Sequence, residues 1–161
     1  MEDTMTEMKQ KETGELERYL GTLYEKLTML GIKEFEITED NFLSTITVVD
    51  VEKRRYVVPL CSSMDEPLTK VTKILKEKRG LAAITICIVG AMPHRENEPL
   101  PLPEDNSFEF FIAAIESRVM NKVKVWKINR DKKGRPIFPL GREIESSDFK
   151  SMFTEDYFSV S

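Results

Sequence analysis

The sequence predicts a single α+β domain, in which an N-terminal helix precedes an antiparallel strand meander, a second helix, and further strands ending in a C-terminal hairpin. Two segments carry apolar residues at helical spacing, and several others alternate apolar with polar residues or are rich in β-branched residues. The 161 residues suit one domain. We assign it to residues 13–141, between a polar N-terminal segment at 1–12 and a polar C-terminal tail at 142–161.

The first predicted helix is marked by leucines that share one face of a helix. These residues are Leu16, Leu20, Leu23, Leu27 and Leu30. Thr4 and Glu7 have the spacing of a capping box, and Gly31 stands where a helix would end. The pattern predicts an amphipathic helix that stops at Gly31.

Three strands are expected next. The segment 33–38 alternates apolar residues, 42–50 is rich in Thr, Val and Ile, and 56–60 contains Pro59, which must end a strand or lie at a sheet edge. Polar turns separate the three segments. They are therefore interpreted as an antiparallel meander.

A second helix and a buried strand follow. Ser63 and Glu66 have capping-box spacing, and Pro67 suits a first helical turn. The apolar face of this helix is formed by Leu68, Val71, Ile74 and Leu75, and the helix is expected to end at Gly80. The run LAAITICIVG is apolar and β-branched throughout, which is typical of a strand buried on both faces.

The last third of the chain begins with residues 91–106, where four prolines stand among acidic residues, and which we interpret as an extended, exposed insertion. The segment 108–117 fits helical and strand periods equally well, so periodicity leaves both open. The segment 122–129 alternates like a strand, and 131–134 is a hairpin turn into RPIFPL.

Composition indicates a soluble intracellular protein. The chain has 28 acidic and 24 basic residues, a net charge of −4, and its longest apolar run is far shorter than the ~20 residues that span a bilayer. The acidic N-terminus does not resemble a signal or transit peptide. Cys61 and Cys87 form neither a metal motif nor a disulfide framework, and burial in apolar strands would make both thiols inert.

The sequence offers no pattern of catalytic residues, metal ligands or cofactor-binding residues. His94 is the only histidine, and we interpret it as a surface residue. The seven glycines form no phosphate-binding loop. A metal-dependent nuclease needs an acid and a Glu-x-Lys on its strands, but 56–60 has neither, and Asp131 and Lys133 fall on a hairpin tip.

A basic stripe is the strongest functional signal. Residues 122–135 hold seven Lys or Arg residues against Asp131 alone, which is typical of a phosphate-facing surface or of a solvated hairpin. The candidate RNA contacts are Lys124, Lys127, Arg130, Lys132, Lys133 and Arg135. The candidate partner-interface residues are Trp126, Ile137, Phe138 and Leu140, and core positions for Trp126 and Phe138 remain open.

The segment FEFFIAAIES, a short turn and VKVWKIN resemble the strand-turn-strand signature of the tRNA-intron endonuclease family. The likeness is greatest to the small, non-catalytic subunits of eukaryotic tRNA-splicing endonucleases. Val57-Val58-Pro59 and the helix face over 68–75 match the family order, and the resemblance extends over residues 15–140. The strand over 81–90 and the insertion at 91–106 are extra to that pattern.

The resemblance implies a nuclease-like mixed sheet, with 108–117 as a strand. It implies a nuclear, non-catalytic subunit that supports a catalytic endonuclease subunit, or a second copy of itself, and contacts precursor tRNA through the complex, with no cofactor or membrane. Catalytic members use Tyr, His and Lys. Here Asn106 and Ser107 stand where the Lys is expected, and 61–63 where the His is expected.

Two alternatives stay open. One is an acidic protein-interaction or chaperone-like module with no nucleic-acid role, which would have no need of seven positive charges in 14 residues. The other is a degenerate metal-dependent nuclease fold, which shares the early order of elements.

Overall fold

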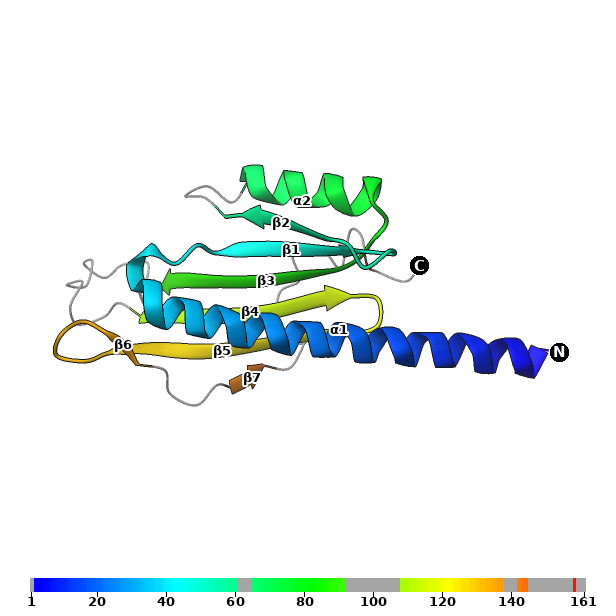
Figure 1. The fold of residues 1–161 in the computed structure, drawn as a ribbon, viewed down its shortest axis with the longest axis horizontal. Coiled ribbons are helices and arrows are strands. Elements are labelled where there is room, and N and C mark those ends of the chain that lie inside the picture. Colours follow the sequence, from blue (N-terminus) through cyan, green and yellow to red (C-terminus); the bar gives the residue numbers. More distant parts are fainter. Residues whose placement is uncertain (1, 61–64, 92–107, 138–141, 145–157, 159–161) are drawn as a thin grey trace, which may run out of the picture.

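The computed structural model describes residues 2–60, 65–91, 108–137, 142–144 and 158 (Figure 1). Helix α1 leads through the short 3-10 turn η1 to a β-hairpin, which helix α2 connects to the remaining strands. The elements are α1 (Glu2–Thr38), η1 (Glu39–Asn41), β1 (Thr45–Asp50), β2 (Arg55–Pro59), α2 (Asp65–Glu77), β3 (Gly80–Ala91), β4 (Phe108–Ser117), β5 (Asn121–Arg130), β6 (Pro136–Ile137) and β7 (Arg142–Ile144).

One antiparallel sheet organises the fold. Its strand order is β2-β1-β3-β4-β5-β6, and β7 also pairs with β5. Helix α1 runs across one face and continues beyond the sheet at its N-terminal end, while α2 lies at the β2 edge (Figure 1). The predicted α+β class, with two helices and an antiparallel meander sheet, is confirmed. The mixed sheet that the family resemblance implies is wrong for the described strands, because all of their pairings are antiparallel.

The face beneath α1 forms the larger core. Leu20, Tyr24 and Phe35 from α1 pack with Ile84 and Phe111 from the middle of the sheet, and all five side chains are buried. The Tyr24 hydroxyl donates a 2.6 Å hydrogen bond to the backbone carbonyl of Ala113 in β4. This bond fixes the helix to the central strands.

The opposite face forms a second core beneath α2. Val71 and Leu75 of α2 pack against Ile46 and Val48 of β1, and Phe158 from near the C-terminus joins them. Alternate residues of β1 thus serve the two cores, because successive side chains of a strand point to opposite faces. Buried positions on both faces explain the continuous apolar runs of the central strands.

The strand predicted over 33–38 is wrong, because α1 continues through these residues to Thr38. Phe35 lies one helical turn beyond Gly31 and is buried, whereas Ile37 is 82% exposed. The alternation of Phe35 and Ile37 fits a strand, but only Phe35 is buried, which fits the helical face of α1. The meander before α2 therefore has two strands, β1 and β2, instead of three.

The expected helix end at Gly31 is also wrong. An added Cβ at Gly31 would stand 2.8 Å from Ile86 Cγ2 and 3.2 Å from Phe111 Cζ. The glycine is thus required where the helix approaches the sheet, and no helix ends there. The expected capping box at Thr4 fails too, because α1 begins at Glu2 and includes the polar segment 2–12.

The later elements follow the sequence more closely. Residues 108–117 form strand β4, the option that the family resemblance favoured, and β4 pairs with β5 from Glu109↔Ile128 to Glu116↔Asn121. The insertion lies outside the described residues except for Ala91, which ends β3. In the predicted polar tail, 142–144 form β7 beside β5, and Phe158 is buried.

Candidate nucleic-acid interface

The β5–β6 hairpin is held by the side chain of Asp131. Its Oδ1 accepts hydrogen bonds of 2.9 Å from the backbone amides of Lys133 and Arg135. Backbone bonds of 3.0 Å join Asp131 N to Arg135 O and Gly134 N to Asp131 O. Gly134 has φ +81°, which glycine adopts without steric cost. The turn predicted over 131–134 is therefore present and well defined.

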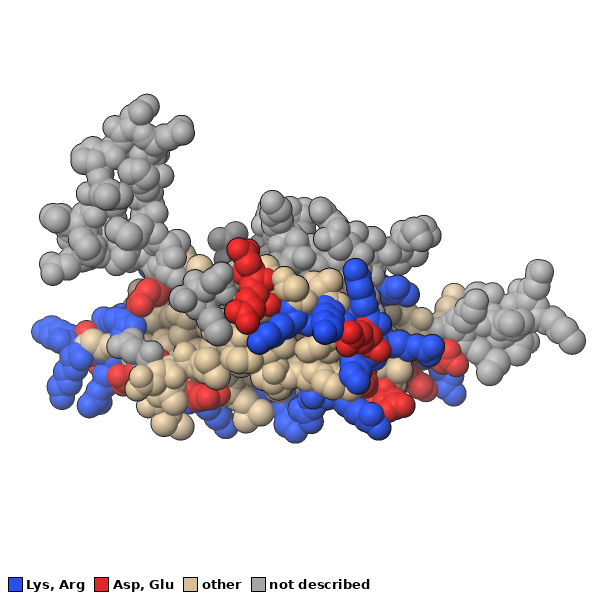
Figure 2. Space-filling model, turned by 90° about the horizontal axis from the view of Figure 1, so that it is seen from above, with Lys and Arg blue, Asp and Glu red and all other residues tan. Residues whose placement is uncertain are grey.

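Three cations project from this tip. Lys132, Lys133 and Arg135 are exposed, and none has an ion-pair partner among the described residues. Figure 2 shows Lys and Arg side chains gathered at the end of the molecule where Figure 1 places the hairpin. A rigid turn that carries uncompensated positive charge is suited to phosphate contact.

Arg130 has a different role from that of the tip cations. Its Nε lies 2.9 Å from Glu109 Oε2, its Nη2 lies 3.2 Å from Glu109 Oε1, and its Nη1 donates a 2.8 Å bond to the Gly134 carbonyl. This bidentate pair joins β4 to the hairpin tip. The guanidinium group therefore stabilises the hairpin, and its charge is compensated by Glu109.

The two remaining RNA candidates lie on opposite faces of β5. Lys124 is opposite Ala113 in the register, on the α1 face, whereas Lys127 is opposite Phe110 on the other face. Lys124 is half-buried and Lys127 is exposed. The six candidates therefore do not form one surface. The three tip cations and the paired Arg130 lie at the hairpin tip, whereas Lys124 and Lys127 lie apart on β5.

The partner-interface candidates also separate. Trp126 is half-buried against the α1-side core, where its ring meets Phe111 edge-on at 5.8 Å between centroids. Ile137 ends the two-residue strand β6 and pairs with Asn129. Phe138 and Leu140 lie outside the described residues. At the outer side of β5, β6 pairs with Asn129 and Arg130, and β7 pairs with residues 123–125.

Sequence reasoning missed a second group of cations. Lys76, Arg79 and Arg118 line a cavity of about 530 Å³ at the opposite end of the sheet from the β5–β6 tip. Arg79 and Arg118 are 39 positions apart and belong to no local motif, so only the pairing of β3 with β4 brings them together.

Other candidate groups show little sign of reactivity. Burial raises the pKa of the Cys87 thiol to about 11, as expected for an inert cysteine in an apolar strand. Cys61 and His94 lie outside the described residues.

The described residues offer neither a metal-binding group nor a membrane-spanning helix. Within the described ranges, no group of three or more His, Cys, Asp or Glu residues is placed to hold a metal ion. None of the helices there has the length and apolarity to cross a membrane. No family model, curated protein or solved structure matches the chain.

Proposed function

We propose that this chain is a non-catalytic structural subunit of a nuclear tRNA-splicing endonuclease, which supports a catalytic partner and contributes to precursor-tRNA binding. The observation that carries the proposal is the β4–β5 hairpin. The two segments that resemble the family signature pair antiparallel over eight registered positions. Their continuation carries Lys132, Lys133 and Arg135 on a fixed turn.

The order of elements gives further support. Strand β2 ends in Val57-Val58-Pro59, helix α2 follows with its apolar face toward the sheet, and the β4–β5 hairpin comes later. The positions where catalytic members carry His and Lys are occupied here by 61–63 and 106–107, none of which is His or Lys. Without those groups the chain lacks the acid and base that RNA cleavage requires.

The partner is tested by purifying the tagged chain from its native cells. We expect a catalytic endonuclease subunit to copurify, together with site-accurate cleavage of intron-containing precursor tRNA. Depleting the chain from the purified complex should reduce that cleavage. Isolation of the chain without any endonuclease subunit or cleavage activity would contradict the proposal.

RNA contact is tested by salt titration of RNA affinity within the assembled complex. Replacing Lys132, Lys133 and Arg135 with Gln should weaken binding nearly equally across sequences. The slope of log affinity against log salt should fall by about 0.7–0.9 for each lost phosphate contact.

The matched control replaces Lys70, Lys73 and Lys78 on and after α2, which removes the same charge at the β2 edge, far from the hairpin in the strand order. The control slope should equal that of the wild type. If the hairpin variant also keeps the wild-type slope, the hairpin is an ordinary solvated turn. The chain would then fit better an acidic protein-interaction module with no nucleic-acid role.

A further inference from the structure

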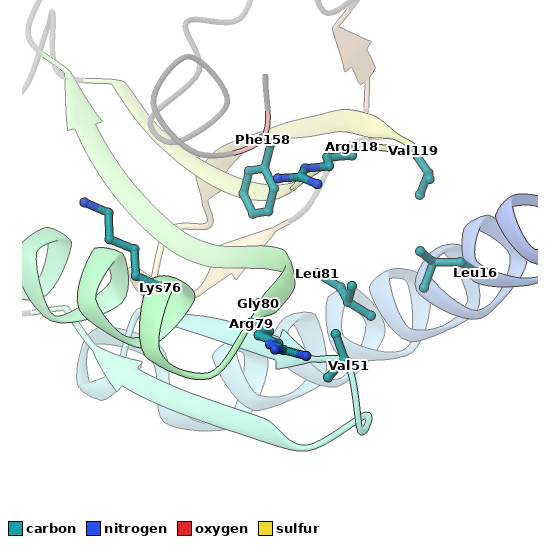
Figure 3. Close-up of a pocket in the computed structure, with 9 residues that line it drawn as sticks. All are labelled: Leu16, Val51, Lys76, Arg79, Gly80, Leu81, Arg118, Val119 and Phe158. Atoms are coloured by element: carbon teal, nitrogen blue, oxygen red, sulfur yellow. The ribbon is translucent and has the colours of Figure 1, made fainter. Parts of the chain in front are cut away.

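The cavity of about 530 Å³ lies where the N-terminal half of α1, the end of α2 and the turns at β1–β2 and β4–β5 meet. Its lining is divided between aliphatic or aromatic side chains and cations (Figure 3). The apolar lining residues are Leu16, Val51, Leu81, Val119 and Phe158. The volume falls within the range of small-molecule sites.

Two arginines supply the positive charge inside this cavity. In Figure 3 the guanidinium group of Arg118 points toward the Phe158 ring, and Arg79 lies on the other side of Leu81. Lys76 directs its ammonium group away from the other labelled side chains, so only its stem serves as wall. The two arginines therefore approach the cavity from different elements.

The charge of both arginines is uncompensated within the described part of the chain. Neither Arg79 nor Arg118 has an ion-pair or hydrogen-bond partner there, and no described lining residue is acidic. Two acidic residues that adjoin lining positions, Glu52 and Glu77, are paired with Arg54 and Lys73. A bound anion would therefore not compete with an existing salt bridge.

Fixed backbone positions carry the two arginines. Arg79 adopts φ +54° directly before Gly80, which is buried where any Cβ would collide with Leu75. Arg118 follows Ser117, whose Oγ donates a 2.8 Å bond to the Met120 carbonyl and accepts a 2.9 Å bond from the Met120 amide. The backbone positions from which the Arg79 and Arg118 side chains extend are therefore fixed.

We propose that this cavity binds an organic phosphate whose body is apolar, a function separate from the RNA role proposed above. A phosphate monoester carries nearly two negative charges and three acceptor oxygens, and the fork of an arginine guanidinium suits its geometry. The positive charge of the second arginine adds to the attraction across the cavity. The aliphatic walls then cover the apolar body. A free metabolite and a lipid headgroup share this chemistry.

The probe is octyl phosphate, titrated into the full chain by calorimetry and by chemical-shift mapping. Saturable binding is expected, at least about tenfold tighter than inorganic phosphate, which lacks the apolar body, and tighter than octanoate, which carries less charge. Sedimentation with phosphatidic acid vesicles separates the two sources. If the chain sediments with the vesicles and the cavity variants do not, the natural ligand is a lipid. If the chain binds octyl phosphate but does not sediment with the vesicles, the natural ligand is a free organic phosphate.

Variants locate the binding. Arg79→Gln and Arg118→Gln should each weaken octyl phosphate binding on the order of tenfold, since each removes a positive charge from the cavity lining. Lys78→Gln removes the same charge from an exposed position outside the lining and should leave affinity unchanged. Val51→Asp, at a wall residue that is 52% exposed, should abolish binding without unfolding the chain.

Three results would overturn the proposal. One is the lack of saturable binding of octyl phosphate by the folded wild type. Another is equal affinity for octyl phosphate and inorganic phosphate. The third is an affinity that Arg79→Gln, Arg118→Gln and Val51→Asp all leave unchanged while circular dichroism shows each variant folded.

Discussion

A methyl group added at Gly31 would collide with the sheet, because its carbon would stand 2.8 Å from Ile86 Cγ2 and 3.2 Å from Phe111 Cζ. Both neighbours are buried and have little room to move. We therefore expect Gly31→Ala to lower the free energy of unfolding by about 1–3 kcal/mol, the usual cost of overpacking. Urea denaturation measures the difference.

Gly14→Ala is the matched control on the same helix. An added Cβ at Gly14 meets nothing within 4 Å. Alanine restricts the unfolded chain and favours the helix, so this variant should gain roughly 0.5–1 kcal/mol. If both substitutions stabilise the protein, α1 does not pack against the sheet at Gly31 as described.

The Asp50 carboxylate makes the stability of the fold depend on pH in the acid range. Its Oδ1 accepts bonds of 2.9 Å from the amides of Glu52 and Arg54, and its Oδ2 accepts a 3.0 Å bond from the Tyr56 hydroxyl. Burial favours the neutral acid, but the Arg54 amide, the Tyr56 hydroxyl and the Glu52 amide outweigh it. The pKa of Asp50 is therefore held below its usual 3.8.

Because the folded-state pKa is lowered, Asp50 stabilises the protein above about pH 3.8, and this stabilisation is lost as the pH falls through the folded-state value. Asp50→Asn should lower stability at neutral pH and flatten the acid side of the curve of unfolding free energy against pH. Glu36→Gln, at an exposed position of α1, is the control. Equal acid slopes for wild type and Asp50→Asn would contradict this role.

At the scale of elements, α1 is held to the sheet by one buried polar contact as well as by its apolar face. The Tyr24 hydroxyl bonds the Ala113 carbonyl at 2.6 Å in a buried setting. Tyr24→Phe keeps the ring but removes this bond, and should lower the free energy of unfolding by about 0.5–1.5 kcal/mol.

Tyr19→Phe is the control for this prediction, because the Tyr19 hydroxyl has no hydrogen-bond partner among the described residues. The Tyr19 ring lies 4.6 Å from Lys53 Nζ, a contact that phenylalanine retains. Thermal unfolding should show a loss in Tyr24→Phe only. A similar loss in both variants would mean that the hydroxyl bond contributes little.

Local patterns predict those elements whose signals lie within a few residues. The apolar face of α2, the β-branched run of β3 and the turn around Asp131 and Gly134 are of this kind. Residues 33–38 are not, because their alternation satisfies a strand while Phe35 also continues the helical face that begins at Leu20. Contact with Phe111, distant in sequence, selects the helix, as its ring centroid lies 6.0 Å from that of Phe35.

At the scale of the whole molecule, a candidate site can likewise be predicted from sequence only where its residues are close together along the chain. The hairpin cations Lys132, Lys133 and Arg135 can be predicted from sequence because they lie within one turn of the chain. Arg79 and Arg118 share a cavity only because β3 and β4 pair antiparallel, with Ala82 opposite Ser117. Arg130 cannot be separated from its basic neighbours by sequence, since its partner Glu109 is 21 positions away.

At the scale of the whole molecule, the proposed function predicts that RNA cleavage requires a catalytic partner and is absent from the isolated chain. If the chain is the non-catalytic subunit proposed above, the purified chain should not cleave intron-containing precursor tRNA, because its sequence holds one histidine and lacks His and Lys at the positions where the resembled family carries them. Adding the copurified catalytic subunit should give cleavage at both splice sites, measured by gel electrophoresis of the RNA products. His94→Ala should leave that complex active. Site-accurate cleavage by the pure chain that His94→Ala abolishes would instead show that this chain is itself the nuclease.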